Sequence, residues 1–162
     1  MGIRLATIGV YGFTADTFRA ALLDAGVTHL ADVRQRRGVR GPEYAWANSK
    51  RLQAMLADAG IAYSHHLDLA PTTELRHLQY AEDDRRGVGK RSRTELAPGY
   101  IAGYTKQILD RADLDAFVAS LPEAELTALM CVERDPEACH RSLLAERLAD
   151  RYGASVVHLR PG

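Results

Sequence analysis

The sequence predicts a single α/β domain whose sheet contains about five mostly parallel strands. The chain has 162 residues, of which 46% are hydrophobic, and this is the size and apolar content of one compact domain. Short apolar runs rich in β-forming residues alternate with segments of helical periodicity. This alternation is expected when each strand is followed by a crossover helix that returns the chain to a parallel sheet.

The strands are predicted from apolar runs of the length that a buried strand requires. We expect five of them, at Ile3–Ile8, His29–Val33, Ile61–His65, Leu126–Val132 and Ser155–Leu159.

The first two helices are predicted together with the residues that begin and end them. A helix over Ala15–Ala25 has Thr14 as its expected N-cap and Gly26 as its terminator. A second helix follows Asn48, the expected cap, and ends at Gly60. Its buried stripe is formed by Leu52, Met55, Leu56 and Ala59.

The pattern loosens between residues 67 and 98, which we interpret as a lid or an insertion in the single domain. A helix is expected over Thr73–Asp84, followed by a loop rich in glycine and arginine over Arg85–Arg93. Helical periodicity returns over Tyr100–Leu109, and a last helix is expected over Arg141–Tyr152.

The composition bears on which partners the chain can attract and on the cell compartment in which we expect it. The 21 basic and 21 acidic residues cancel, so the whole chain is not drawn to nucleic acids or membranes by net charge. No signal-peptide start and no run of eighteen apolar residues is present, and we therefore expect a cytoplasmic protein without a membrane partner. Two cysteines are too few for a disulfide framework.

The segment between the fourth strand and the last helix carries the densest chemistry. In open α/β sheets, ligands bind beyond the carboxyl ends of the strands, and this segment leaves the sheet there. Five reactive side chains fall within eleven positions, namely Cys131, Glu133, Cys139, His140 and Arg141.

Three interpretations of these residues remain open. In the first, Cys139 or Cys131 is a nucleophile, His140 or Glu133 manages protons, and Arg141 holds an anion; the helix start would lower the pKa of Cys139. In the second, the two cysteines, Glu133 and His140 bind a metal, although their spacing matches no recognised zinc pattern and adjacent ligands strain a tetrahedral site. In the third, the residues are structural.

The ends of the first two strands point to the same crevice. Thr7 and Gly9 close the first strand, and Gly9 permits a close approach of backbone. Asp32 and Arg34 close the second and are expected on one face. Arg34 together with Arg141 would suit a phosphate or a carboxylate, whereas the alternative is that Asp32 and Arg34 bind each other.

Two loops concentrate positive charge without an acidic residue between the cations. If both flank the crevice, they attract a nucleotide or a nucleic acid, and Tyr44 and Trp46 are placed to stack on bases. The alternative is a solvated surface without a partner. The cations are Arg34, Arg36, Arg37 and Arg40 in one loop, and Arg85, Arg86, Lys90, Arg91 and Arg93 in the other.

The motifs Thr7-Ile-Gly9, Asp32-Val-Arg34 and Cys131-x-Glu133-x-x-Pro136-x-x-Cys139-His140-Arg141 resemble the family called domain of unknown function 488, over essentially the whole chain. His65, Asp68 and Leu69 also match, but Ala70-Pro71 stands where that family has two glycines. The resemblance implies a Rossmann-like, three-layer α/β fold and a site built from these motifs. It implies no established reaction.

Our leading hypothesis is that the chain binds and processes an anionic small molecule or a nucleic acid. The alternative is a non-catalytic metal-binding or interaction module that uses Cys131, Glu133, Cys139 and His140. The sequence does not decide whether the protein is an enzyme, and it names no cofactor or oligomeric state. The expected catalytic residues are Cys131, Glu133, Cys139 and His140, and the expected substrate-binding residues are Thr7, Gly9, Asp32, Arg34, Tyr44, His65 and Arg141.

Overall fold

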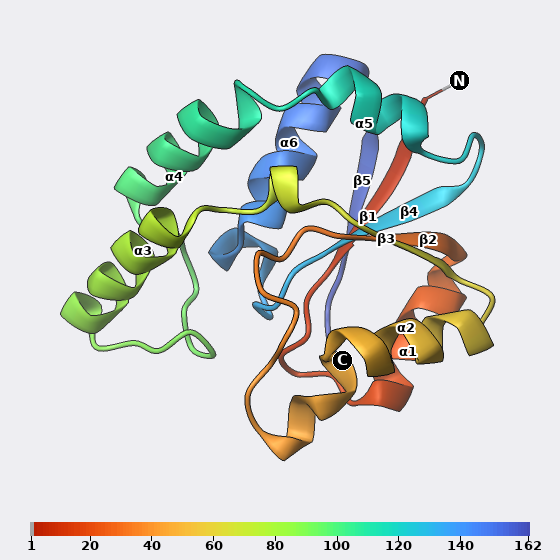
Figure 1. Cartoon of the computed structure of the whole chain (residues 1–162), viewed down its shortest axis with the longest axis horizontal. Coiled ribbons are helices and arrows are strands. Elements are labelled where there is room, and N and C mark those ends of the chain that lie inside the picture. The colour runs from red at the N-terminus through yellow and green to blue at the C-terminus, as the bar shows by residue number, and fades with distance from the viewer. Residues whose placement is uncertain (1) are drawn as a thin grey trace.

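The computed structural model, which describes residues 2–162, contains one sheet of five strands. All strand pairs are parallel, and the strand order is β3-β2-β4-β1-β5 (Figure 1). The predicted parallel α/β sheet is therefore confirmed. The strands are β1 (Arg4–Ile8), β2 (Val27–Asp32), β3 (Ala62–His65), β4 (Leu126–Met130) and β5 (Ser155–Leu159).

Helices cover both faces of the sheet and produce three layers (Figure 1). One face carries α1 (Ala15–Ala25) and α2 (Ser49–Asp58), while the other carries α4 (Pro98–Tyr104), α5 (Leu114–Ser120) and α6 (His140–Tyr152). Successive side chains along each strand point to opposite faces of the sheet, so the hydrophobic core is divided into one cluster on each face. Ala6 and Ile8 pack in the cluster of α1 and α2, whereas Leu5 packs in the cluster of α4, α5 and α6. The fold is consistent with a Rossmann-like three-layer architecture.

The segment predicted as a lid or insertion contains a long helix and a loop beside the sheet. A 3₁₀ turn, η2 (Leu67–Leu69), leads into α3 (Thr73–Arg86), and residues 87–97 then connect α3 to α4. The helix expected over Tyr100–Leu109 begins earlier, at Pro98, and its end is the π-helical turn η3 (Thr105–Leu109). The sequence did not predict the turns η1 (Pro42–Ala47) and η4 (Pro136–Ala138) or the seven-residue α5. All three are shorter than the window of about 11–18 residues in which helical periodicity is recognised.

The predicted caps of α1 are present, but the cap of α2 differs. Thr14 Oγ1 accepts a hydrogen bond from the backbone N–H of Thr17 at 3.1 Å, and Gly26 ends α1 in the left-handed conformation with φ 82°. Asn48 occupies the N-cap position of α2, yet its Oδ1 accepts from the N–H of Val39 at 2.7 Å instead of capping the helix. Among residues 2–162, no helix is long and apolar enough to cross a membrane.

Candidate functional site

The residues around Cys131 lie at the carboxyl edge of three neighbouring strands. The chain leaving β4 is held between β1 and β2 by backbone hydrogen bonds. The N–H of Cys131 donates to the carbonyl of Ile8 at 3.2 Å, and the N–H of Val33 donates to the carbonyl of Met130 at 3.0 Å. α6 begins at the same edge, with Cys139 at its N-cap. The sheet therefore brings together segments that are far apart in the sequence.

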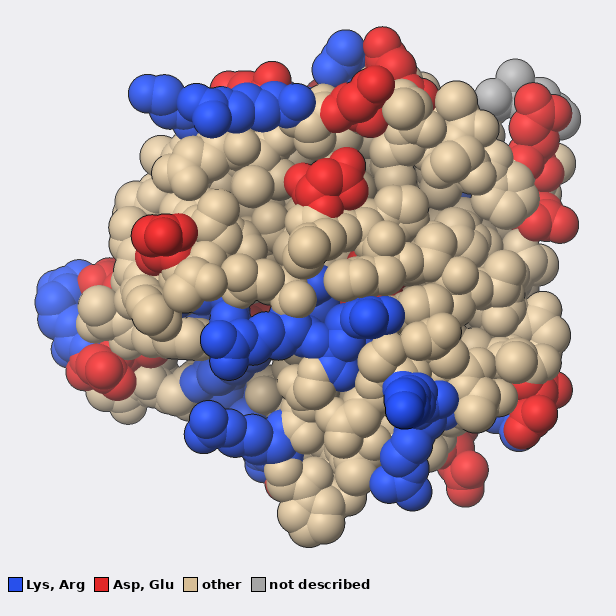
Figure 2. All heavy atoms as spheres, viewed as in Figure 1, with Lys and Arg blue, Asp and Glu red and all other residues tan. Residues whose placement is uncertain are grey.

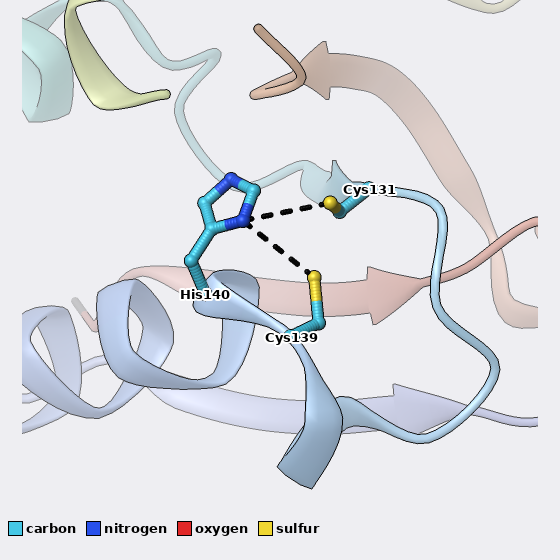
Figure 3. A group of neighbouring side chains, drawn as sticks. All are labelled: Cys131, Cys139 and His140. Carbon is cyan, nitrogen blue, oxygen red and sulfur yellow. Dashed lines mark hydrogen bonds between the residues drawn. The ribbon is translucent and has the colours of Figure 1, made fainter. Parts of the chain in front are cut away.

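Two thiols and one imidazole converge at this edge. The Nδ1 atom of His140 lies 3.5 Å from the Sγ of Cys131 and 3.7 Å from the Sγ of Cys139 (Figure 3). All three potential ligand atoms lie within 4.8 Å of one another. Cys139 has an extended backbone, with φ −138° and ψ 147°, and helical geometry begins at the next residue. This change of direction allows two adjacent side chains to face the same point.

The orientation of the His140 ring is fixed by the loop after β2. Nε2 of His140 lies 2.8 Å from the carbonyl oxygen of Val33. Because a carbonyl oxygen can only accept a hydrogen bond, Nε2 carries a proton and donates it. Nδ1 is therefore the ring nitrogen that faces the two sulfurs.

Glu133 connects the Cys131 thiol with Arg93, which belongs to the segment of residues 67–98. Its Oε2 accepts a hydrogen bond from the thiol of Cys131 at 3.3 Å, and its Oε1 accepts from Arg93 Nη1 at 3.1 Å. The guanidinium of Arg93 also binds Asp83 on α3, and both members of this ion pair are buried. The Glu133 carboxylate is consequently held in one position by a residue forty positions earlier in the chain.

The surroundings shift the pKa values of the two cysteines in opposite directions. Burial raises the pKa of Cys131 well above its usual value, and the neighbouring Cys139 and Glu133 add to this effect. Burial opposes a thiolate at Cys139 too, but the neighbouring Cys131, His140 and Arg141 hold the pKa of Cys139 well below its usual value. Burial opposes a charged His140, yet the adjacent Cys139 raises its pKa. Cys139 is therefore the more acidic thiol of the pair.

A cleft of about 1050 Å³ opens above this cluster. Cys131, Glu133 and His140 form its buried end, and Tyr11, Tyr80 and Tyr100 also line it. Its rim is built from the loop after β2, from α3 and from the loop of residues 87–97. Lys and Arg side chains gather around a hollow in the middle of the face drawn in Figure 2, and acidic side chains lie mainly nearer its margins.

Seven cationic residues line this cleft, and Glu133 is its single acidic residue among residues 2–162. Three of the cations bind carboxylates: Arg34 binds Asp32, Arg91 binds Glu43, and Arg93 binds Asp83 and Glu133. Within the same described part of the chain, the others form no ion pair. These four cations are Arg36, Arg40, Arg76 and Lys90.

Lys90 lines the same cleft as Cys131 and Glu133. Burial disfavours its charged form, but the negative charge of Glu133 and the nearby Tyr80 and Cys131 keep the pKa of Lys90 above its usual value. Lys90 is thus a cation at neutral pH.

The structure places Arg34 and Arg141 in structural contacts. Arg34 donates from Nε to Asp32 Oδ1 at 2.9 Å and from Nη2 to Asp32 Oδ2 at 2.8 Å, and its Nη1 donates to the carbonyl of Ala47. Of the two alternatives for Asp32 and Arg34, the mutual pair is therefore the one that forms. Arg141 is 0% exposed, donates to the carbonyls of Glu133 and Arg134, and is absent from the lining of the cleft.

Three other expected binding residues make contacts within the protein. Thr7 Oγ1 is hydrogen-bonded to His158 Nδ1 at 2.6 Å, and His65 Nε2 donates to the carbonyl of Arg34 at 2.9 Å. A Cβ atom added at Gly9 would lie 1.9 Å from the carbonyl oxygen of Glu133. The close approach predicted at Gly9 thus exists, and the group that approaches is the chain after β4.

The aromatic residues of the cleft differ from those expected. Tyr44 packs against Tyr11 with ring centroids 5.2 Å apart, and its hydroxyl accepts from the N–H of Gly12. Trp46 packs on Phe18 in the core, at 4.9 Å. The tyrosines that line the cleft are Tyr11, Tyr80 and Tyr100, which sequence reasoning missed.

Arg76 was missed as well, although a local signal was available. Arg76 and Tyr80 are four residues apart on the predicted helix, so they share one helix face. In the structure, Arg76 Nη2 donates to the Tyr80 hydroxyl at 3.0 Å, and both residues line the cleft.

The comparisons with known proteins agree with the resemblance found in the motifs. A family described as "Domain of unknown function DUF488" matches residues 14–148. Neither a curated protein nor a solved structure matches the chain at a significant level.

Proposed function

The chain belongs to the domain of unknown function 488 family, and we propose that it binds a nucleotide or a nucleic acid in the cleft and processes it at the buried end. One observation carries the proposal. The four cations without a carboxylate partner in residues 2–162 line the same cleft as Cys131, Glu133 and His140. A phosphate-bearing substrate would supply the negative charge that these four cations lack, next to the most reactive side chains of the chain.

Phosphate is favoured by the kind of cations and by their neighbours. Three of the four are arginines, whose planar guanidinium groups bind phosphate oxygens through two parallel hydrogen bonds. Tyr11, Tyr80 and Tyr100 provide aromatic faces in the same cleft, and bases of single-stranded nucleic acids stack on such faces. The volume of about 1050 Å³ is at the upper end of the range of ligand pockets and accommodates a nucleotide with its phosphates.

In this proposal, Arg36, Arg40, Arg76 and Lys90 hold the anion, and Arg34 and Arg141 keep the surrounding loops in place. The guanidinium of Arg34 already satisfies a buried carboxylate. Removing it to bind a ligand would leave Asp32, which is 0% exposed, as an uncompensated charge.

The reactive step is assigned to the side chains at the buried end. Glu133 is positioned to accept a proton, since it already accepts the hydrogen bond of the Cys131 thiol and is held by Arg93. Cys131 and His140 reach the cleft, and Cys139 contacts His140 from behind them. Cys131, Glu133, Cys139 and His140 remain the proposed catalytic residues.

The test is a titration of a fluorescently labelled single-stranded oligonucleotide, and of a labelled nucleotide, at several salt concentrations. We expect binding that weakens with salt, with the logarithmic slope reduced by about 0.7 for each phosphate contact that is removed. Arg36→Ala, Arg40→Ala, Arg76→Ala and Lys90→Ala should each weaken binding. Arg19→Ala is the matched control, because Arg19 is an exposed arginine on α1 outside the cleft.

Two results would contradict this proposal. One is the absence of binding to either probe at low salt. The other is binding that the four cleft variants weaken no more than Arg19→Ala does.

A further inference from the structure

We infer that Cys131, Cys139 and His140 form a binding site for one thiolate-preferring divalent cation such as zinc, with a fourth coordination position open to the basic cleft. This inference goes beyond the proposed function, because binding of phosphate by the four unpaired cations does not need a metal. Among residues 2–162, this is the only cluster of at least three His, Cys, Asp or Glu side chains with the spacing for a metal ion.

The distances between the three atoms agree with a tetrahedral site. Zinc binds thiolate sulfur at about 2.3 Å and imidazole nitrogen at about 2.0–2.1 Å, so sulfur and nitrogen ligands of one tetrahedral ion lie about 3.6 Å apart. The two sulfur–nitrogen distances in the structure are 3.5 and 3.7 Å. The two sulfurs also lie within 4.8 Å of each other. The two sulfur–nitrogen distances thus match those of one tetrahedral zinc ion.

The expected strain of adjacent ligands is relieved by the backbone. Cys139 is extended and His140 is the first residue of α6, so their side chains leave the chain in directions that meet at Nδ1 and Sγ (Figure 3). The sequence spacing matches no recognised zinc motif because two ligands come from the start of a helix and the third follows β4.

The hydrogen bond made by Nε2 of His140 orients the imidazole ring for metal binding through Nδ1. Metal-binding histidines usually donate their other N–H to a carbonyl or carboxylate, which fixes the ring and selects the nitrogen that coordinates. Nε2 of His140 makes this bond to the carbonyl of Val33 at 2.8 Å. Nδ1 is left to coordinate, and it is the atom that faces both sulfurs.

The number of ligands distinguishes an open site from a closed one. Structural zinc sites have four protein ligands, whereas catalytic sites have three and keep the fourth position for water or substrate. Cys131 and His140 line the cleft, so an ion bound by the trio would face it. Glu133 contacts Cys131 but lies outside the three-atom cluster, and Arg93 holds its second oxygen. Two thiolates and one imidazole favour zinc over magnesium or calcium, which prefer oxygen ligands.

The test begins with reduced protein that has been stripped with a chelator and then titrated with cobalt(II). We expect a cobalt–thiolate charge-transfer absorption that saturates at about one equivalent per chain, is abolished by zinc, and is absent with magnesium. Cys131→Ser, Cys139→Ser and His140→Gln should each lose it. His65→Gln is the matched control, because His65 also ends a strand at this edge but binds only the carbonyl of Arg34.

A second measurement on the unchanged protein covers the case in which a buried variant fails to fold. Zinc should slow the alkylation of both Cys131 and Cys139, followed residue by residue with mass spectrometry, and magnesium should not. The inference is overturned if cobalt gives no thiolate absorption, if zinc protects neither or only one of the cysteines, or if His140→Gln that folds normally binds cobalt as the parent does.

The outcome separates this inference from the proposed function. Oligonucleotide binding that persists in chelator, in a protein that takes up no cobalt, removes only the metal site. A protein that binds cobalt as expected but binds neither oligonucleotide nor nucleotide removes only the proposed function.

Discussion

At the scale of single residues, the candidate site depends on backbone positions as much as on its reactive side chains. Gly9 shows this most directly. Its missing Cβ leaves room for the carbonyl of Glu133, and the same carbonyl accepts a hydrogen bond from Arg141 at 2.7 Å. The chain after β4 can lie against β1 only because no side chain begins at Gly9.

We therefore predict that Gly9→Ala destabilises the fold and displaces Glu133. The new Cβ would lie 1.9 Å from the Glu133 carbonyl oxygen, so the chain after β4 must move. Forcing an extra methyl into a filled space costs about 1–3 kcal/mol. Chemical denaturation gives the free energy of unfolding for the variant and the parent.

Gly89→Ala is the control for this change. Gly89 also belongs to the cleft, but nothing lies within 4 Å of a Cβ added there, and we expect a change within about 0.5 kcal/mol. Equal stability of the two glycine variants would contradict the assigned role of Gly9.

At the scale of secondary-structure elements, a chain of hydrogen bonds connects β2 with β3 and with the turn that follows β3. Ser64 Oγ lies 2.7 Å from His29 Nε2 and 2.7 Å from His66 Nε2. His29 Nδ1 also contacts the hydroxyl of Thr127 on β4 at 3.3 Å. Burial lowers the pKa of both histidines, with Glu125 acting in the opposite direction on His29 and Asp68 on His66.

This arrangement predicts that the two histidines make stability decrease in mild acid. A histidine whose pKa is lowered by folding is bound in its neutral form, so its contribution is complete above the pKa of an unfolded histidine, about 6.5. The contribution is lost as the pH falls below that value and through the lowered pKa of the folded protein. Urea denaturation at pH 7.5 and pH 5 measures the difference.

The double variant His29→Gln, His66→Gln provides the comparison, since glutamine does not titrate. Its stability should fall less between pH 7.5 and pH 5 than that of the parent. An unchanged or larger fall in the double variant would show that other groups cause the pH dependence.

At the scale of the whole molecule, a chain without net charge has a cleft with an excess of positive charge. The 21 basic and 21 acidic residues balance only as a total. Arg36, Arg40, Arg76 and Lys90 face the cleft, and Glu133 is the single acid among the described residues that line it. The excess of positive charge in the cleft therefore results from where the folded chain places its charged residues, and not from its net charge.

We predict that pyrophosphate stabilises the folded protein by binding this cleft. A ligand that binds only the native state at a concentration about 100-fold above its Kd adds about 2.7 kcal/mol to the free energy of unfolding. Thermal unfolding should shift upward with pyrophosphate at constant ionic strength. The shift should be smaller in the triple variant that combines Arg36→Ala, Arg40→Ala and Lys90→Ala.

Arg19→Ala again serves as the control, because multivalent anions stabilise many proteins without a specific site. If the triple variant and Arg19→Ala respond to pyrophosphate in the same way as the parent, the effect is general and the cleft is not its origin.

Much of the fold could be predicted because its signals are local. The alternation of apolar runs with helical periods predicted the parallel sheet, and Thr14 and Gly26 predicted both ends of α1. The segment of residues 131–141 was identified as the candidate site because its residue types are dense and follow a buried strand. Periodicity, capping and strand ends depend on neighbours along the chain, which a sequence displays directly.

The partners of each charge were decided only by the tertiary structure. Arg34 binds Asp32, Arg141 is enclosed by carbonyls, and Arg76 arrives from α3 to line the cleft. Which cations remain unpaired depends on contacts between segments that are far apart in the sequence, and on burial, which makes an unpaired charge costly. The sequence by itself determined the elements and the residues that carry the chemistry. The packing of β1, β2 and β4 at one edge decided which of those residues meet, because only there do the sulfurs, the imidazole and the carboxylate come within hydrogen-bonding distance.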